Sequence, residues 1–191
     1  MNVFILCSGR SGSMSFIKAC SHFSNFSAGH ETLANKLGDE RFAYPPNHIE
    51  ADNRLSWLLG RLDEHYGDEA FYVHLIRDRM KTAESFNRRW DFREGIIKAY
   101  TEGILMESRE KGLPYCLDYY DTVHANIRCF LKDKTHKMTI HLERIEEDFV
   151  TFARAVGAEG DLDLALKEFQ TRHNASQKES WLSHLFGKLK R

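Results

Sequence analysis

The sequence lacks an apolar run long enough to cross a membrane, which takes about 18 consecutive residues. Its first apolar stretch, Val3 to Cys7, is also too short for the core of a secretory signal peptide. Cysteine is scarce as well, and the four that occur show neither the CxxC spacing of a zinc or redox site nor the density of a disulfide framework. No HExxH motif is present either. These absences predict a cytoplasmic protein with reduced thiols and no metal site.

An excess of charge of either sign is also missing. Lys and Arg total 27 and Asp and Glu total 28, which gives a formal net charge of -1. A chain balanced in this way has no global field that would attract nucleic acid or an anionic membrane. We therefore expect neither as a partner, and any polyanion must be bound by a local group of residues.

Short apolar runs alternate along the chain with segments of helical periodicity. Buried strands are predicted over 3–7, 71–76 and 138–142, and short strands also fit 23–28 and 113–117. Helices are predicted over 14–23, 55–62, 79–90, 94–111, 122–131 and 146–156. This alternation predicts an α/β fold with a mainly parallel central sheet and helices on both faces, as a single domain over 1–191. Ligands of such sheets bind beyond the carboxyl ends of the strands.

A glycine-rich loop, Ser8-Gly9-Arg10-Ser11-Gly12-Ser13, joins the first predicted strand to the first predicted helix. Glycines let backbone N–H groups turn toward a phosphate, and a helix N-terminus favours negative charge. A tight turn without a ligand is the structural alternative. A kinase or NTPase P-loop would read GxxxxGK[ST], whereas here no lysine follows Gly12 and Arg10 lies within the loop. The loop therefore predicts an anion cradle whose chemistry differs from that of an NTPase.

A second strand-to-loop crossing carries a related signal. The run His74-Leu75-Ile76-Arg77-Asp78-Arg79 is followed by Ser85, eight residues after Arg77. A guanidinium at a strand end and a hydroxyl one or two helical turns later can hold a phosphate from two sides. The structural alternative is a salt bridge between Arg77 and Asp78 or another acid. For the nearby Arg88, Arg89 and Arg93, a solvated helix face is favoured over binding.

Together, the two crossings resemble the sulfotransferases that use 3′-phosphoadenosine 5′-phosphosulfate (PAPS). The resemblance implies a P-loop NTPase-like sulfotransferase fold and in-line transfer of a sulfuryl group from PAPS to an acceptor hydroxyl, without a metal. It implies that the glycine-rich loop binds the 5′-phosphosulfate and that Arg77 and Ser85 bind the 3′-phosphate. The implied PAPS-binding residues are Ser8, Gly9, Arg10, Ser11, Gly12, Ser13, Met14, Arg77, Ser85, Arg172 and Asn174.

A third match lies in Gly29-His30-Glu31, which resembles the segment that carries the catalytic base in many bacterial-type members. The acceptor hydroxyl must lose its proton as it attacks sulfur, so a carboxylate or imidazole near the cradle has a defined role. The resemblance implies Glu31 as the first candidate for this base and His30 as the second, with Arg10 as a catalytic residue that stabilises leaving charge. A core histidine and an acid at a helix N-terminus are the structural alternatives. The departures from the family are Arg10, where many cytosolic members have lysine, and a short chain that leaves little room for an acceptor pocket.

Several questions stay open at this stage. An apolar stripe predicts an amphipathic helix over about 178–190, which would pack on its own domain or a second subunit in preference to a membrane. Two other functions remain as alternatives, a P-loop kinase or NTPase with Asp78 as its magnesium carboxylate, and a catalytically silent nucleotide-binding module. Whether the acceptor is a glycan, a lipid or a small metabolite is not predicted, and neither is the oligomeric state, so a homo-oligomer stays open.

Overall fold

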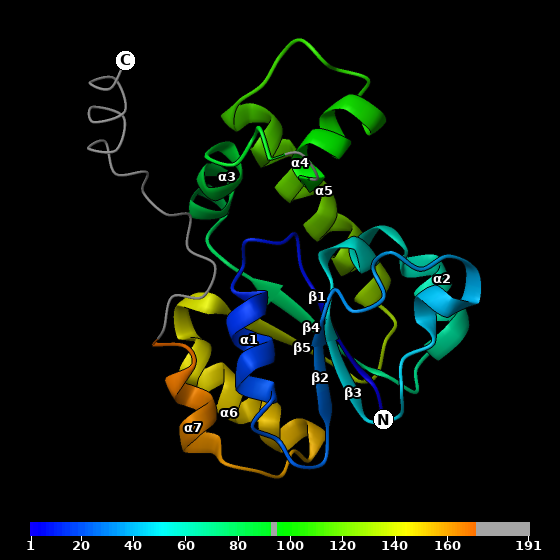
Figure 1. Ribbon diagram of the computed structural model, residues 1–191, viewed down its shortest axis with the longest axis vertical. Helices are drawn as coiled ribbons and strands as arrows, with labels where there is room; N and C mark the ends of the chain where they lie inside the picture. Colours follow the sequence, from blue (N-terminus) through cyan, green and yellow to red (C-terminus); the bar gives the residue numbers. More distant parts are fainter. Residues whose placement is uncertain (93–94, 171–191) are drawn as a thin grey trace, which may run out of the picture.

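Five strands form one parallel sheet at the centre of the structure, a computed structural model that describes residues 1–92 and 95–170 (Figure 1). The strands are β1 (Val3–Leu6), β2 (Ser27–His30), β3 (His48–Ala51), β4 (Phe71–Ile76) and β5 (Lys137–His141). Their order in the sheet is β2-β3-β1-β4-β5, and all four strand pairs are parallel. The predicted α/β fold with a parallel sheet is therefore confirmed.

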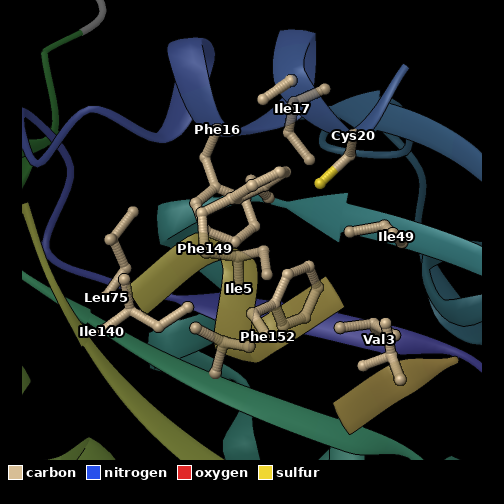
Figure 2. Packing of buried hydrophobic residues seen from close by; sticks show 14 of the residues in the cluster. Val3, Ile5, Phe16, Ile17, Cys20, Ile49, Leu75, Ile140, Phe149 and Phe152 are labelled. Carbon is tan, nitrogen blue, oxygen red and sulfur yellow. The ribbon is translucent and has the colours of Figure 1, made fainter. Parts of the chain in front are cut away.

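One face of the sheet is covered by α1 (Ser13–Cys20), α6 (Ile145–Val156) and α7 (Leu162–Lys167). Alternate residues of each strand point to this face, so Val3 and Ile5 of β1 join the same apolar cluster as the helices. Figure 2 shows Phe149 and Phe152 of α6 packed with Phe16 of α1 over these strands. This packing fixes α1 against the sheet and thereby fixes the loop that precedes it.

The opposite face is covered by α2 (Leu59–Tyr66), α3 (Arg79–Asn87), α4 (Ile96–Ala99) and α5 (Leu113–Leu131). Here the alternate strand residues Phe4, Leu6 and Tyr72 are fully buried among helix side chains. The 19-residue α5 is the longest helix in the described part of the chain. Helices therefore lie on both faces of the sheet, as predicted.

Two predicted elements between β4 and β5 are wrong. The segment 113–117 is not a strand but the first turn of α5, because Pro114 sets the backbone angle that a helix start requires and Gly112, with φ +123°, ends the preceding loop. The predicted helix over 94–111 is helical only in α4 and in a π-helical turn, Tyr100–Ile104, that follows it. Ile104, Leu105 and Met106 are exposed, so nothing stabilises further helix by packing.

The strands before α2 also differ from prediction. The second strand lies at Ser27–His30 rather than over 23–28, and β3 was not predicted. The shift matters because His30 becomes the last residue of β2, at the carboxyl edge of the sheet. The predicted helix over 14–23 begins at Ser13 and ends at Cys20, and that over 55–62 divides into a 3-10 turn, Asn53–Trp57, and α2.

The connections of β1 and β4 diverge at the carboxyl edge of the sheet. β1 leads to β2 beyond β3, whereas the neighbouring β4 leads away to β5 on the other side. Ligands of open α/β sheets bind where adjacent connections diverge in this way. In the part of the chain that the structure describes, no helix has the length and apolarity needed to span a bilayer. Arg93, Arg172, Asn174 and the helix predicted over about 178–190 lie outside the described residues.

Candidate functional site

The glycine-rich loop at the end of β1 adopts an unusual backbone conformation. Gly9, Arg10 and Gly12 all have positive φ, at +86°, +57° and +87°. Left-handed residues next to right-handed ones turn successive N–H groups toward a common point, which makes an anion-binding nest. α1 then starts at Ser13 without a capping side chain and without an acidic residue in its first turn. The positive end of the helix is therefore left for an external anion.

A buried hydroxyl in the same loop supports this interpretation. Among the described residues, Ser11 Oγ is buried without a nitrogen or oxygen partner, and its neighbour is the thiol of Cys7. Buried polar groups in native proteins are nearly always hydrogen-bonded, so such an atom calls for an explanation. An anion oxygen in the nest would provide an acceptor for it. Met14, half-buried in the first turn of α1, lies just beyond the loop.

The second crossing lies directly against this loop. Arg77 Nη1 donates a hydrogen bond to the carbonyl oxygen of Arg10 at 2.8 Å. Arg10 Nε in turn donates to Ser85 Oγ at 3.0 Å. These two hydrogen bonds join residues that are 67 and 75 positions apart in the sequence. The glycine-rich loop and the second crossing therefore form one contiguous site at the carboxyl ends of β1 and β4.

Asp78, beside Arg77, has a structural task. Its side chain caps α3 by accepting from the N–H of Lys81 at 2.8 Å, and its own N–H donates to Glu143 Oε1 at 2.8 Å. The contact of Arg77 is instead with the loop carbonyl. The salt bridge considered for Arg77 and Asp78 is therefore replaced by a helix cap and a loop contact.

Positive charge gathers around Arg10. Burial, together with the nearby charges of Arg89, Arg77 and Arg88, lowers the pKa of its guanidinium to about 10. An anion placed among these groups would relieve both the repulsion and the desolvation. Arg88 is exposed and pairs with Glu84 at 3.9 Å, as expected for a solvated helix face, whereas Arg89 is half-buried. Arg89 therefore contributes to the field of the site, whereas the sequence favoured a solvated helix face for it.

The rear of the loop is held by a buried polar network from α5. Tyr119 Oη donates to the carbonyl oxygen of Ser8 at 2.8 Å. His124 Nε2 lies 3.3 Å from Ser8 Oγ, and His124 Nδ1 lies 2.7 Å from His74 Nε2. Because Ser8 Oγ donates to the carbonyl oxygen of Gly9, at 3.2 Å, it must accept from His124, and His124 must accept from His74. Ser8 thus uses its hydroxyl inside the protein, and it supports the loop from behind.

Both histidines of this network are held neutral. Burial lowers the pKa of His74 to about 3 and that of His124 to about 4, with a further contribution in each case from nearby positive groups that include Arg128. A neutral imidazole can donate from one nitrogen and accept at the other, which the chain of hydrogen bonds to Ser8 requires. This network could not be predicted from the sequence, because a tyrosine or histidine on the buried face of a helix has the same pattern as an ordinary core residue.

The third match, at the end of β2, approaches the loop from the other side. His30 Nε2 lies 3.1 Å from Ser13 Oγ, at the start of α1. Glu31 has a φ of +55°, and its Oε2 forms an ion pair with Arg54 Nη1 at 3.0 Å. His30 therefore contacts the loop directly, whereas Glu31, the next residue, is oriented by a neighbouring arginine.

A buried carboxylate holds this turn in place. Glu50 of β3 accepts from the N–H of Thr32 at 2.8 Å and from its hydroxyl at 2.7 Å, and it lies 2.9 Å from His48 Nε2. Burial alone would raise the pKa of Glu50, but the hydrogen bonds from His48 and Thr32 outweigh burial and lower it below its ordinary value. An ionised Glu50 therefore fixes Thr32, and with it the adjacent Glu31.

The site as a whole brings together the glycine-rich loop, Arg77, Ser85, His30 and Glu31. Arg172 and Asn174 lie outside the described residues. In residues 1–92 and 95–170 no group of three or more His, Cys, Asp or Glu side chains is arranged to hold a metal ion. The arrangement is suited to binding a multiply charged anion beside a group that can accept a proton.

Comparison with known proteins identifies the fold. No family model matches the sequence, and no curated protein matches it. Among solved structures, a sulfotransferase domain from the curacin biosynthetic pathway is similar, with a TM-score of 0.64 at 13% sequence identity. The match covers 90% of this chain and 78% of that one. The chain therefore has a sulfotransferase-like fold.

Proposed function

We propose that the chain is a sulfotransferase that binds PAPS across the carboxyl ends of β1 and β4 and transfers its sulfuryl group to an acceptor hydroxyl. The observation that carries this proposal is the pair of contacts that joins Arg77 and Ser85 to Arg10. It makes one site from two anion-binding segments, as a nucleotide with phosphates on both its 3′ and 5′ positions requires. The shared fold with a sulfotransferase domain supports the same conclusion.

The loop residues have distinct roles in this proposal. The N–H groups of residues 9–13 and the start of α1 bind the 5′-phosphosulfate, and the unpartnered hydroxyl of Ser11 donates to it. Arg10 stabilises the negative charge that builds on the oxygen bridging sulfur and phosphorus as that bond breaks. Arg77 and Ser85 bind the 3′-phosphate.

The acceptor oxygen forms its new bond to sulfur while its proton passes to a group of the protein. Glu31 is our first choice for that base, because its carboxylate retains lone pairs beyond the one that Arg54 engages. His30 is the alternative, since it lies at the loop itself through Ser13. The leaving group is 3′-phosphoadenosine 5′-phosphate (PAP), so the atoms and charges of the step balance without a metal.

Calorimetric titration with PAP, AMP and ADP tests the donor assignment. PAP and AMP differ only in the 3′-phosphate, and ADP controls for the number of phosphates. We expect PAP to bind more tightly than either, and Arg77→Gln to remove about tenfold or more of that preference, since a charge-assisted hydrogen bond contributes about 1.5–3 kcal/mol. Arg79→Gln is the matched control, because Arg79 pairs with the exposed Asp121 on the surface. Equal affinity for PAP and AMP, or no binding of PAP, would refute the assignment.

Substitution of the two candidate bases tests the transfer step. With a confirmed acceptor, the variant that removes the base, Glu31→Gln in our first choice and His30→Gln in the alternative, should lower the rate of sulfation by about 100-fold or more. Its affinity for PAP should stay within a small factor of the parent value. The product is followed with radiolabelled PAPS. If both single variants and the double variant keep the parent rate, neither residue is the base. Absence of transfer to every acceptor in a broad library, despite PAP binding, would instead favour a silent nucleotide-binding module.

A further inference from the structure

A cavity of about 330 Å³ opens beside the candidate base. It lies between the segment that follows β2, the 3-10 turn Asn53–Trp57 and the starts of α2 and α4. All the charged side chains that line it are positive, namely Lys36, Arg41, Arg54 and Arg61. Much of the remaining wall is apolar and includes Leu37, Trp57, Leu58 and Ile96. A cavity of this composition suits a small organic anion with an apolar body.

Two of the four cations are compensated within the protein. Arg41 is buried, pairs with the buried Asp52 and donates to Tyr44 Oη at 2.8 Å. Arg54 pairs with Glu31, as described above. These two arginines shape the wall, but carboxylates already balance their charge.

The other two cations have only weak partners. Lys36 lies 3.9 Å from Glu40, and Arg61 lies 3.5 Å from Asp39 and over the ring of Phe42, with its Cζ 4.8 Å from the ring centroid. The two carboxylates are 78% and 93% exposed, and exposed ion pairs of this kind contribute little. Lys36 and Arg61 can therefore turn their charge toward a ligand in the cavity at small cost.

Two residues that line the cavity link it to the proposed transfer site. Arg54 lines the cavity and also orients Glu31, the first candidate for the base. Trp57 lines it too and stacks on Tyr119, with ring centroids 6.2 Å apart. Tyr119 in turn holds the carbonyl of Ser8 at the glycine-rich loop. A molecule in the cavity therefore contacts one residue that orients Glu31 and a second that is linked to the loop through Tyr119.

We infer that this cavity binds the acceptor, and that the acceptor is a small hydroxylated organic acid with an aromatic or similarly apolar body. The inference rests on the proposed function. The apolar wall of the cavity, which includes Trp57, contacts the body of the acceptor. Lys36 and Arg61 bind the carboxylate of the acceptor, and the hydroxyl of the acceptor lies toward Glu31. Among glycans, lipids and small metabolites, the limited volume selects the last.

Three probes that share a hydroxyphenyl body and carry a negative, a neutral or a positive group at the other end test the inference. They are 4-hydroxyphenylacetate, its neutral amide 4-hydroxyphenylacetamide, and the cationic tyramine. Each is titrated calorimetrically into the full chain saturated with PAP. We expect the acid to bind more tightly than the amide and the amide more tightly than the amine.

Two double variants distinguish an effect of charge inside this cavity from an effect of the overall charge of the protein. In Lys36→Gln/Arg61→Gln the acid should bind about five- to thirtyfold more weakly, while the amide is unaffected, because each of the two exposed charges contributes about 0.5–1 kcal/mol. Arg128→Gln/Lys132→Gln is the matched control. It removes the same two residue types from a second cavity of about 330 Å³, between α5 and β5, and should leave all three affinities unchanged.

The outcomes distinguish this inference from the donor assignment, since PAP affinity is measured on the same samples. If PAP binds but the three probes bind equally or not at all, or the Lys36/Arg61 variant behaves like the control, the acceptor inference is wrong and the donor assignment stands. If PAP does not bind, the proposed function fails, whatever the probes do. If PAP binds and the acid loses affinity only in the Lys36/Arg61 variant, the inference is supported.

Discussion

The buried pair His74 and His124 makes the stability of the protein depend on pH in a way that can be calculated. Their pKa values are about 3 and about 4 in the folded protein, against an ordinary value of 6.5. Near pH 5 the unfolded chain therefore binds two protons that the folded protein does not. The free energy of unfolding rises with pH wherever the unfolded state binds more protons. The contribution of the pair is thus complete above pH 6.5 and is lost as the pH falls from 6.5 toward 4.

The size of the effect at pH 5 is set by the unfolded state. Protonating one histidine there lowers the free energy of the unfolded chain by RT ln(1 + 10^1.5), which is about 2 kcal/mol. The result barely changes while the folded pKa stays below about 4.5, so it does not depend on how the two coupled sites share their protons. For the pair the loss is about 4 kcal/mol between pH 7.5 and pH 5, a large part of the 5–15 kcal/mol that holds a typical domain folded.

Urea unfolding followed by circular dichroism at pH 7.5, 6.5, 5.5 and 5.0 measures this loss. The double variant His74→Gln/His124→Gln cannot take up these protons, so the free-energy difference between parent and variant should change by about 4 kcal/mol across the series. Should the double variant fail to fold, the single variant His124→Gln should show about half the effect. The same exchange at the exposed His136 is the control. A difference that stays constant within about 1 kcal/mol would refute the reasoning, because the histidines would then titrate alike in both states.

Three further predictions concern the loop and its supports. Gly12→Ala should lower the free energy of unfolding by about 1–2 kcal/mol through its φ of +87° alone. The added Cβ would also lie 2.6 Å from Leu142 Cδ1. In urea unfolding, a second substitution, Leu142→Ala, should therefore recover the stability lost to this clash but not the stability lost to the backbone conformation. Tyr119→Phe should cost about 1–2 kcal/mol and weaken PAP binding in calorimetry, because the carbonyl of Ser8 loses its donor; unchanged PAP affinity would mean that the network does not shape the loop. Glu50→Gln should destabilise the protein by about 1–3 kcal/mol at pH 7, and the gap should close as the pH falls below 4.5, where the lowered pKa of Glu50 is passed; a gap independent of pH would contradict the ionised state.

Strands made of continuous apolar residues, and the spacing of polar residues that follow them, could be predicted from the sequence. β1 and β4 were located within one residue because fully buried parallel strands consist of uninterrupted apolar side chains. The approach of Arg77 and Ser85 to the glycine-rich loop followed from the same logic, since both segments leave neighbouring strands at one edge. A strand end and a helix spacing are local properties, and local properties can be read without a structure.

Elements built on polar contacts could not be read in this way. β3 was missed because its buried residues include His48 and Glu50, which satisfy each other and Thr32 instead of forming an apolar run. Tyr119 and His124 contact Ser8 across 111 and 116 residues of sequence, and on α5 they look like ordinary members of a buried stripe. The start of α5 was misread because the apolar residues around Pro114 fit a short strand equally well. For the contacts of Tyr119 and His124 with Ser8, the deciding partner is distant in the chain.

Although the charge of the chain is balanced overall, acidic and basic side chains have different roles near the carboxyl edge of the sheet. The net charge is -1, yet the carboxylates near the carboxyl edge are taken up by internal tasks: Glu50 fixes the turn at Thr32, Asp78 caps α3 and Asp52 pairs with Arg41. Meanwhile, burial and the charges of neighbouring arginines lower the pKa of Arg10. A polyanion is therefore attracted to one edge of a protein whose net charge is close to zero. In physiological salt this attraction extends over only about a Debye length, roughly 8 Å. Binding of the nucleotide should accordingly depend on salt mainly through affinity at the site, with little effect on the rate of association, because steering at long range needs a charge that this protein does not carry.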